Sequence, residues 1–197
     1  MASVPGWYPG EEPKPAPMPL LLVQGFLNTR DLEKGSDLLE DPGTAHDWLL
    51  RSGLLESESP LTDGELRMSR GVRESIRRLL MSNGDGGEGG GDGLAALKAL
   101  AGARRPRLAV DDDGALSLDN PERRSLQGAL FELLLIIRRA QEEGTWARLK
   151  VCGNPECLWV YYDRSRNQQG NWCDMAVCGN RLKNRELRAR RETPTPL

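Results

Sequence analysis

The sequence is poor in histidine and in aromatic residues. Its 197 residues include one histidine, His46, and only two phenylalanines and three tyrosines. It contains no phosphate-binding glycine loop and no nucleophile motif, so no acid–base or covalent catalytic group can be assembled. We therefore expect a protein that is not an enzyme, with His46 on a solvent-exposed helix face.

Long apolar runs are also absent. The longest, Leu133–Ile137, is followed directly by Arg138 and is far shorter than the about 20 residues of a membrane span. The first residues have neither the basic segment nor the apolar core of a signal peptide. These absences predict a cytoplasmic protein with no membrane partner.

Two segments lack the apolar side chains that offset the entropy of ordering. Six of the first 19 residues are proline, and seven of the eleven residues 83–93 are glycine. We expect a Pro-rich disordered tail at 1–19, a mobile Gly-rich loop at 83–93 and a short tail at 193–197. Roughly 160 residues remain to fold.

Residues 20–145 show mainly helical periodicity. Thr62 and Glu65 form a capping box before an apolar stripe, and Thr44 and Asp47 open a shorter helix in the same way. A third amphipathic helix follows the Gly-rich loop. This segment is therefore predicted to be one helical domain.

The second half of that segment contains the strongest helix. Its stripe from Leu126 to Ile137 starts after Asn120-Pro121 and closes at Gly144. Before it, two short apolar runs flank the turn 112–114, which predicts a small β-hairpin. The predicted fold class is mainly α with a small β-hairpin (α+β), followed by a zinc module over 146–192.

All four cysteines lie within 27 residues, in the spacing C-x4-C-x15-C-x4-C: Cys152, Cys157, Cys173 and Cys178. Two short pairs separated by about 15–20 residues are typical of a zinc site in a reducing compartment. Disulfides or an iron–sulfur cluster are the alternatives. Four thiolates fill a tetrahedral ion and leave no position for water, so we predict one structural zinc.

The residues around the cysteines predict a treble-clef-like finger. Both pairs contain Cys-Gly-Asn, at 152–154 and 178–180, and Gly and Asn tolerate the positive φ of a metal knuckle. Between the pairs, the aromatic segment 158–162 predicts a strand of a hairpin that runs into a polar turn. A helix rich in arginine follows Cys178.

The charge of the chain is divided unevenly. Residues 1–150 have 19 basic and 24 acidic side chains, whereas residues 151–197 have 8 and 5. This asymmetry favours an anionic partner, DNA or RNA, although a solvated basic face is the alternative. The candidate contacts are Arg164, Arg166, Arg181, Lys183, Arg185 and Arg188.

The cysteine segment resembles the CGNR zinc finger, a family named for the tetrapeptide that stands here at 178–181. The aromatic-D-x-S-x-N element of that family matches Tyr162, Asp163, Ser165 and Asn167. Segments 26–30, 37–39, 48–49 and 53–54 resemble the ABATE domain that usually precedes this finger. The resemblance implies a mainly bacterial, stress-response regulator of transcription with a nucleic-acid-binding finger. In such a regulator we expect the N-terminal domain to sense an effector or to mediate dimerisation.

Several residues have two interpretations. Asn28 and Arg30 are a candidate effector site, or they cap a helix and form an ion pair with Asp31 or Asp37. We predict structural roles for the motif residues Asp163, Ser165, Asn167 and Asn180. Asp163 is expected to accept hydrogen bonds within the polar turn and to form an ion pair with Arg181. Relatives often have basic residues just before the Trp-Cys pair, where this chain has Gly170-Asn171, so we expect modest affinity.

Two classes of function remain. The first is a nucleic-acid-binding regulator. The alternative is a protein-interaction adaptor whose rigid zinc module presents aromatic anchors at Trp159, Tyr161 and Tyr162, although burial of these rings against the finger's own helix is the other interpretation. A protein partner or a homodimer is a further expectation.

Overall fold

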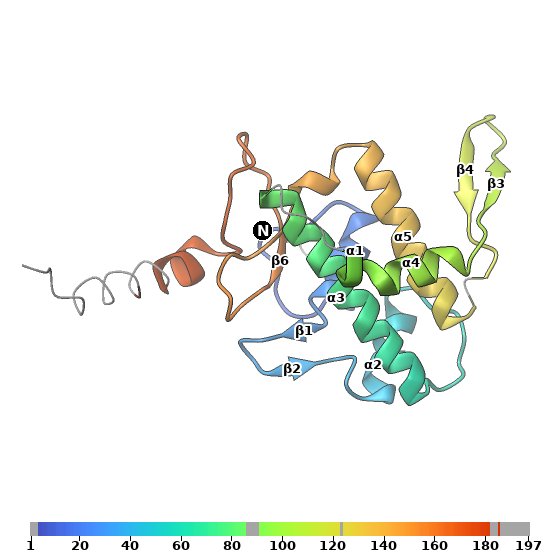
Figure 1. Cartoon of the computed structure of the whole chain (residues 1–197), viewed down its shortest axis with the longest axis horizontal. Helices are drawn as coiled ribbons and strands as arrows, with labels where there is room; N and C mark the ends of the chain where they lie inside the picture. The colour runs from blue at the N-terminus through green and yellow to red at the C-terminus, as the bar shows by residue number, and fades with distance from the viewer. Residues whose placement is uncertain (1–3, 86–90, 123, 182–184, 186–197) are drawn as a thin grey trace, which may run out of the picture.

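The computed structural model describes residues 4–85, 91–122, 124–181 and 185. Within these ranges five α-helices surround one core, and three two-stranded antiparallel sheets lie at its edges (Figure 1). The helices are α1 (Leu20–Leu27), α2 (Pro42–Arg51), α3 (Asp63–Asp85), α4 (Ala95–Gly102) and α5 (Leu126–Glu142). The sheets pair β1 (Arg30–Asp31) with β2 (Ser36–Asp37), β3 (Arg107–Val110) with β4 (Leu116–Asp119), and β5 (Leu149–Val151) with β6 (Val160–Tyr162). Short helical turns are η1 (Gly91–Leu94), η2 (Trp146–Arg148) and η3 (Met175–Gly179). The predicted mainly α class with a small hairpin is confirmed.

The start of α3 follows from its capping box. The Thr62 backbone N–H donates to Glu65 Oε2 at 2.8 Å, and the Glu65 N–H donates back to Thr62 Oγ1 at 3.3 Å. The helix extends to Asp85, so the first residues of the predicted Gly-rich loop are helical. Residues 86–90 of that loop lie outside the described residues. None of the helices in the described part of the chain is long and apolar enough to cross a membrane.

Two helices begin at residues other than those predicted. The N-cap of α2 is Asp41, whose carboxylate accepts from the N–H groups of Gly43 and Thr44, because Pro42 favours the first helical position. The N-cap of α5 is Ser125. Asn120 instead donates a hydrogen bond to the Gly128 carbonyl, at 2.8 Å.

One hydrophobic core runs through the helical part and into the cysteine segment. Phe26 of α1, Ile76 of α3 and Leu133 of α5 are fully buried, and Leu149 and Val160 of the β5–β6 sheet belong to the same cluster. A second, smaller cluster consists of the cysteines with Trp159 and Trp172 packed against them. The β5–β6 sheet therefore lies at the edge of the main core, and the predicted boundary at 145–146 does not coincide with the division between the two clusters.

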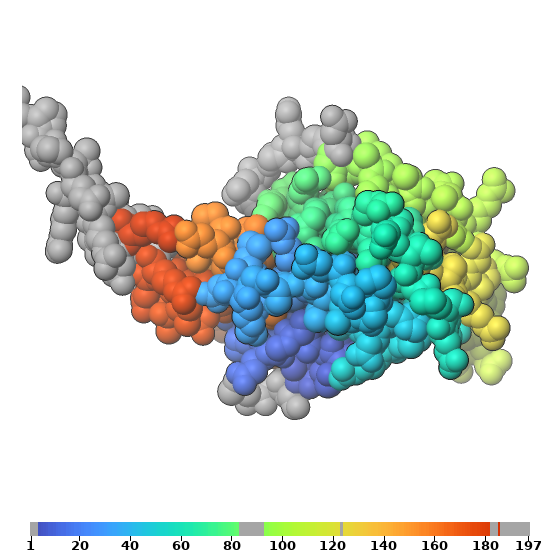
Figure 2. Space-filling view, turned by 90° about the horizontal axis from the view of Figure 1, so that it is seen from below, coloured from blue at the N-terminus to red at the C-terminus, as the bar shows by residue number. Residues whose placement is uncertain are grey.

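The N-terminal segment packs against both parts. Tyr8 and Ala16 are buried, the Ala16 N–H donates to Gln24 Oε1, and the Lys14 carbonyl accepts from the Tyr162 N–H at 2.9 Å. Figure 2 shows the blue N-terminal segments packed beside the orange and red cysteine segment. The predicted disordered tail is therefore wrong for residues 4–19, because their aromatic side chains and free carbonyls find buried partners that composition does not reveal.

Candidate metal centre

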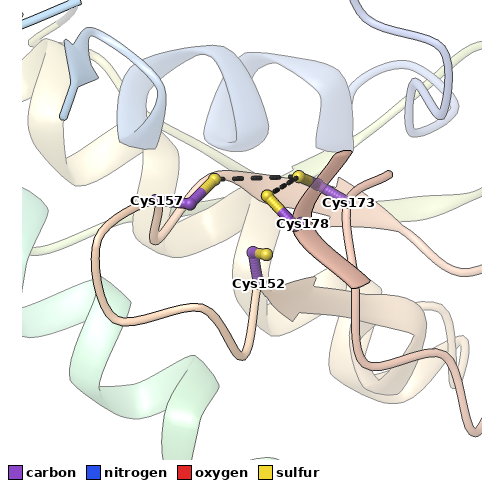
Figure 3. A group of neighbouring side chains, drawn as sticks. All are labelled: Cys152, Cys157, Cys173 and Cys178. Atoms are coloured by element: carbon purple, nitrogen blue, oxygen red, sulfur yellow. Dashed lines mark hydrogen bonds between the residues drawn. The ribbon is translucent and has the colours of Figure 1, made fainter. Parts of the chain in front are cut away.

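Four thiols converge in the C-terminal part of the chain. Cys152 follows β5, Cys157 precedes β6, and Cys173 and Cys178 lie before and within η3. All four Sγ atoms lie within 4.8 Å of one another, and Cys157–Cys173 and Cys173–Cys178 are each separated by 3.7 Å (Figure 3). A tetrahedral zinc with Zn–S bonds of about 2.3 Å requires sulfur atoms about 3.8 Å apart. The donor set thus fits one structural zinc, as predicted.

Three of the thiols influence one another's ionisation. Hydrogen bonds from Cys157 and Cys173 lower the pKa of Cys152 to about 2. The hydrogen bond with Cys152 raises the pKa of Cys157 to about 12, and it also raises the pKa of Cys173. Zinc binding releases the protons of such thiols, because the metal ion binds the thiolate form.

The glycines of the two knuckles have a role different from the one predicted. Neither Gly153 nor Gly179 has positive φ; the left-handed residue is Leu158, at 53°, directly after the first knuckle. A Cβ on Gly153 would lie 3.2 Å from the Asn171 carbonyl oxygen, so close packing favours glycine at that position. A Cβ on Gly179 would lie 2.5 Å from Sδ of the exposed Met175, a flexible side chain that can move away.

The strand partner of the aromatic segment is also different from the prediction. Val160–Tyr162 pairs with Leu149–Val151, upstream of the first cysteine pair, in the register Val151↔Val160. The Cys152–Cys157 knuckle is therefore the connection between the two strands. Zinc binding closes this hairpin, which explains why its strands can contribute to the main core.

The predicted turn hydrogen bonds of Asp163 are confirmed. Its carboxylate accepts from the N–H groups of Ser165, at 2.9 Å, and Gly170, at 2.8 Å, and lies 3.3 Å from Lys150 Nζ. Ser165 Oγ in turn donates to Asn167 Oδ1. Burial alone would raise the pKa of Asp163, but these hydrogen bonds lower it to about 2. The predicted ion pair of Asp163 with Arg181 is wrong, because the cation beside the Asp163 carboxylate is the ammonium group of Lys150.

Gly170 lies directly against the Asp163 carboxylate. Its N–H and carbonyl both bond within the turn, the carbonyl accepting from the Tyr161 hydroxyl, and a Cβ here would lie 2.9 Å from Asp163 Oδ2. Any side chain at position 170 would push against the carboxylate that closes the turn.

Replacing Asp163 by asparagine is expected to lower the free energy of unfolding by about 1–3 kcal/mol, because an amide NH₂ would face the Gly170 N–H. The folded pKa lies below the ordinary value of 3.8, so the carboxylate contributes fully above that pH and loses its contribution as the pH falls toward 2. Urea unfolding at pH 7 measures the full effect, whereas strong acid would also protonate the zinc ligands. An unchanged midpoint would show that the turn does not depend on this carboxylate.

Asn28 attaches β6 to α1. Its side chain is buried and bonds to both backbone groups of Val160, accepting from the N–H and donating to the carbonyl, each at 2.8 Å. Gln24 adds a second donor to the same carbonyl, at 3.1 Å. These hydrogen bonds favour the structural interpretation of Asn28 over the effector site.

Arg30 also has a partner other than those predicted. Its guanidinium lies 3.8 Å from the Glu74 carboxylate. Arg30 is also the cross-strand partner of Asp37, and its charge contributes to lowering the pKa of that carboxyl. The carboxylate of Asp37 is taken by Arg73, which is almost fully buried and donates two hydrogen bonds to it, at 2.6 and 2.7 Å. Burial would raise the pKa of Asp37, but the Arg73 hydrogen bond and charge lower it.

The sequence analysis missed a second buried arginine, Arg77. Its guanidinium donates to the carbonyls of Leu158 and Leu27, both at 2.6 Å, and thus links the first knuckle to the end of α1. Burial lowers the pKa of Arg77. A signal was present, because Arg73 and Arg77 lie one residue from Val72 and Ile76 on a helix stripe that is otherwise apolar.

The candidate nucleic-acid contacts lie in different environments. Arg164, Arg166, Arg181 and Arg185 are all exposed. Arg164 donates to the Pro15 carbonyl at 2.8 Å, Arg181 pairs with Glu33, and Arg185 lies 2.7 Å from Glu156. Arg166 has no ion pair or hydrogen bond with another described side chain. Lys183 and Arg188 lie outside the described residues, and Asn180 donates to the Ala176 carbonyl.

The aromatic residues of the finger face inward. Tyr161 and Tyr162 are buried, and the half-buried Trp159 donates its Nε1–H to Glu12 at 2.7 Å. They are therefore parts of the fold and not the exposed anchors of an adaptor.

Comparison with known proteins identifies two family models. The model described as "Putative stress-induced transcription regulator" (ABATE) matches residues 22–142, more than half of the chain, and the CGNR zinc finger matches residues 148–191. No curated protein matches the chain. Neither family is an enzyme family. By its matched length, its helical core and its four-cysteine site, this chain belongs to the ABATE family and carries a CGNR zinc finger with one structural zinc.

Proposed function

We propose that the protein is a nucleic-acid-binding regulator whose zinc-bound finger contacts the phosphate backbone. The observation that carries the proposal is the set of four exposed arginines on this zinc-structured segment, at positions 164, 166, 181 and 185. Zinc binding holds the turn and the start of the following helix in place, so these charges need little ordering on binding. Phosphate contacts of this kind position a protein without reading bases.

The intramolecular ion pairs of the finger do not oppose this function strongly. Arg181 and Arg185 have side chains that are 56% and 55% exposed, and their acceptors Glu33 and Glu156 are exposed as well. An exposed ion pair contributes only about 0–1 kcal/mol to the stability of a protein. A phosphate can therefore replace either carboxylate, at a cost that makes the affinity modest.

The test is binding of the zinc-loaded full chain to labelled duplex DNA, single-stranded DNA and RNA, measured by fluorescence anisotropy at several salt concentrations. Arg185→Ala together with Arg188→Ala is expected to weaken binding to all sequences and to reduce the salt slope by roughly one unit per contact removed. Glu156→Gln should have the opposite effect, because it frees Arg185 from its intramolecular acceptor.

The matched control is Arg67→Ala, which removes an exposed arginine of α3 outside the finger and should change neither affinity nor slope. Unchanged binding in the double variant would remove these two positions from the interface. If the zinc-loaded chain binds none of the three nucleic acids at low salt, the result contradicts the proposed function.

A further inference from the structure

The β3–β4 hairpin carries an apolar face that the proposed function does not use. The register pairs Leu108 with Leu118 and Val110 with Leu116, which places four aliphatic side chains on one side of the sheet. Three of them, Leu108, Val110 and Leu116, are 69%, 65% and 67% exposed. An isolated two-stranded hairpin is at best marginally stable in water. A continuous apolar face on such a hairpin is typical of a surface that a partner covers.

The two ends of this hairpin have opposite charges. The tip contains Asp112 and Asp113, and the base contains Arg105, Arg107 and Asp119. Asp119 lies opposite Arg107 in the register, on the other face of the sheet from the four aliphatic side chains, so Arg105 is the basic residue of the base that has no carboxylate across from it. Asp112, Asp113 and Arg105 are exposed and form no ion pair with another residue that the structure describes. The hairpin therefore has an apolar centre between an acidic tip and a base with a net positive charge.

We propose that this face packs against the same face of a second copy of the chain, about a two-fold axis. In such a contact each surface is its own complement. With the two hairpins antiparallel, the acidic tip of one copy lies beside the basic base of the other, whereas a parallel arrangement would bring like charges together. The charge pattern thus favours a second copy as the occupant and sets its orientation.

The size of the face predicts a reversible dimer. Four residues of strand span roughly 14 Å, which gives a contact smaller than the about 800 Å² per partner of a standard interface. The hairpin projects from the end of the molecule opposite the finger (Figure 1), so dimerisation leaves the arginines of the finger exposed. The inference is therefore independent of nucleic-acid binding.

Sedimentation of the zinc-loaded full chain at about 1 to 200 µM tests the proposal, over the range in which a small interface dissociates. The mass is expected to rise with concentration from 21.8 kDa toward twice that value. The variant L108T/V110T/L116T is expected to stay monomeric, because threonine keeps β propensity while removing apolar surface. Unchanged helical circular dichroism and zinc content show that it is folded. Ser117→Lys, on the other face of the hairpin, is the matched control and should still dimerise.

A charge exchange tests the orientation. Arg105→Glu and Asp113→Arg should each weaken the dimer several-fold, and the combined variant should restore it, because the two charges meet across the axis. A wild type that stays monomeric over the whole concentration range would overturn the proposal. The apolar face would then bind a partner other than a second copy of the chain. Dimerisation of the threonine variant like the wild type, or no rescue in the combined variant, would also overturn the proposal.

Discussion

Removal of zinc is expected to unfold the helical part of the chain together with the finger. The metal closes the hairpin whose strands supply Leu149 and Val160 to the main core. Structural zinc contributes about 10–16 kcal/mol in zinc-finger peptides, which matches or exceeds the about 5–15 kcal/mol of a whole domain. We therefore expect a strong chelator, or Cys178→Ser, to abolish most of the far-ultraviolet helical signal at 25 °C.

The control for this experiment is the same chelator saturated with zinc before it is added. Cys152→Ser should behave like Cys178→Ser, because both sulfurs belong to one cluster. Full retention of the helical signal after stoichiometric zinc release would show that the helices fold without the finger.

Substitution of Asn28 by alanine is expected to lower the free energy of unfolding by about 3 kcal/mol or more. The amide makes three buried hydrogen bonds, two to Val160 and one to the Tyr8 hydroxyl. Each buried group left without a partner costs about 1–3 kcal/mol. Urea unfolding monitored by circular dichroism, with zinc in excess, measures the change.

Asn171→Ala provides the comparison for this substitution, because Asn171 is an exposed asparagine of the finger. Its replacement should change stability by less than about 0.5 kcal/mol. A cost below about 1 kcal/mol for Asn28→Ala would mean that water can take over the hydrogen bonds of Val160.

The sequence predicts the features that depend on near neighbours. The capping box of Thr62 and Glu65 and the hairpin turn at 112–114 each involve residues a few positions apart, and the four cysteines lie within one segment of 27 residues; each prediction is confirmed. The links between the two matched regions are different. Asn28 bonds a residue 132 positions away, and Arg77 bonds one 81 positions away.

Such distant contacts produce only a weak signal in the local sequence pattern. A glutamine within the apolar segment 20–27 and two arginines on the apolar side of α3 are polar residues at positions that helical periodicity assigns to the core. They indicate burial with a partner but do not identify the partner. For the same reason, the proline-rich composition of residues 4–19 did not predict their packing on Gln24 and Tyr162.

The central claim is that the zinc finger and the ABATE helices fold as one cooperative unit. Its most direct test is a single thermal unfolding experiment that follows helical circular dichroism and the release of zinc to a chromophoric indicator in the same sample. The shared core and the bonds of Asn28 and Arg77 to the finger predict that both signals change at one temperature. Zinc release in a separate transition well below the loss of helix would contradict the claim.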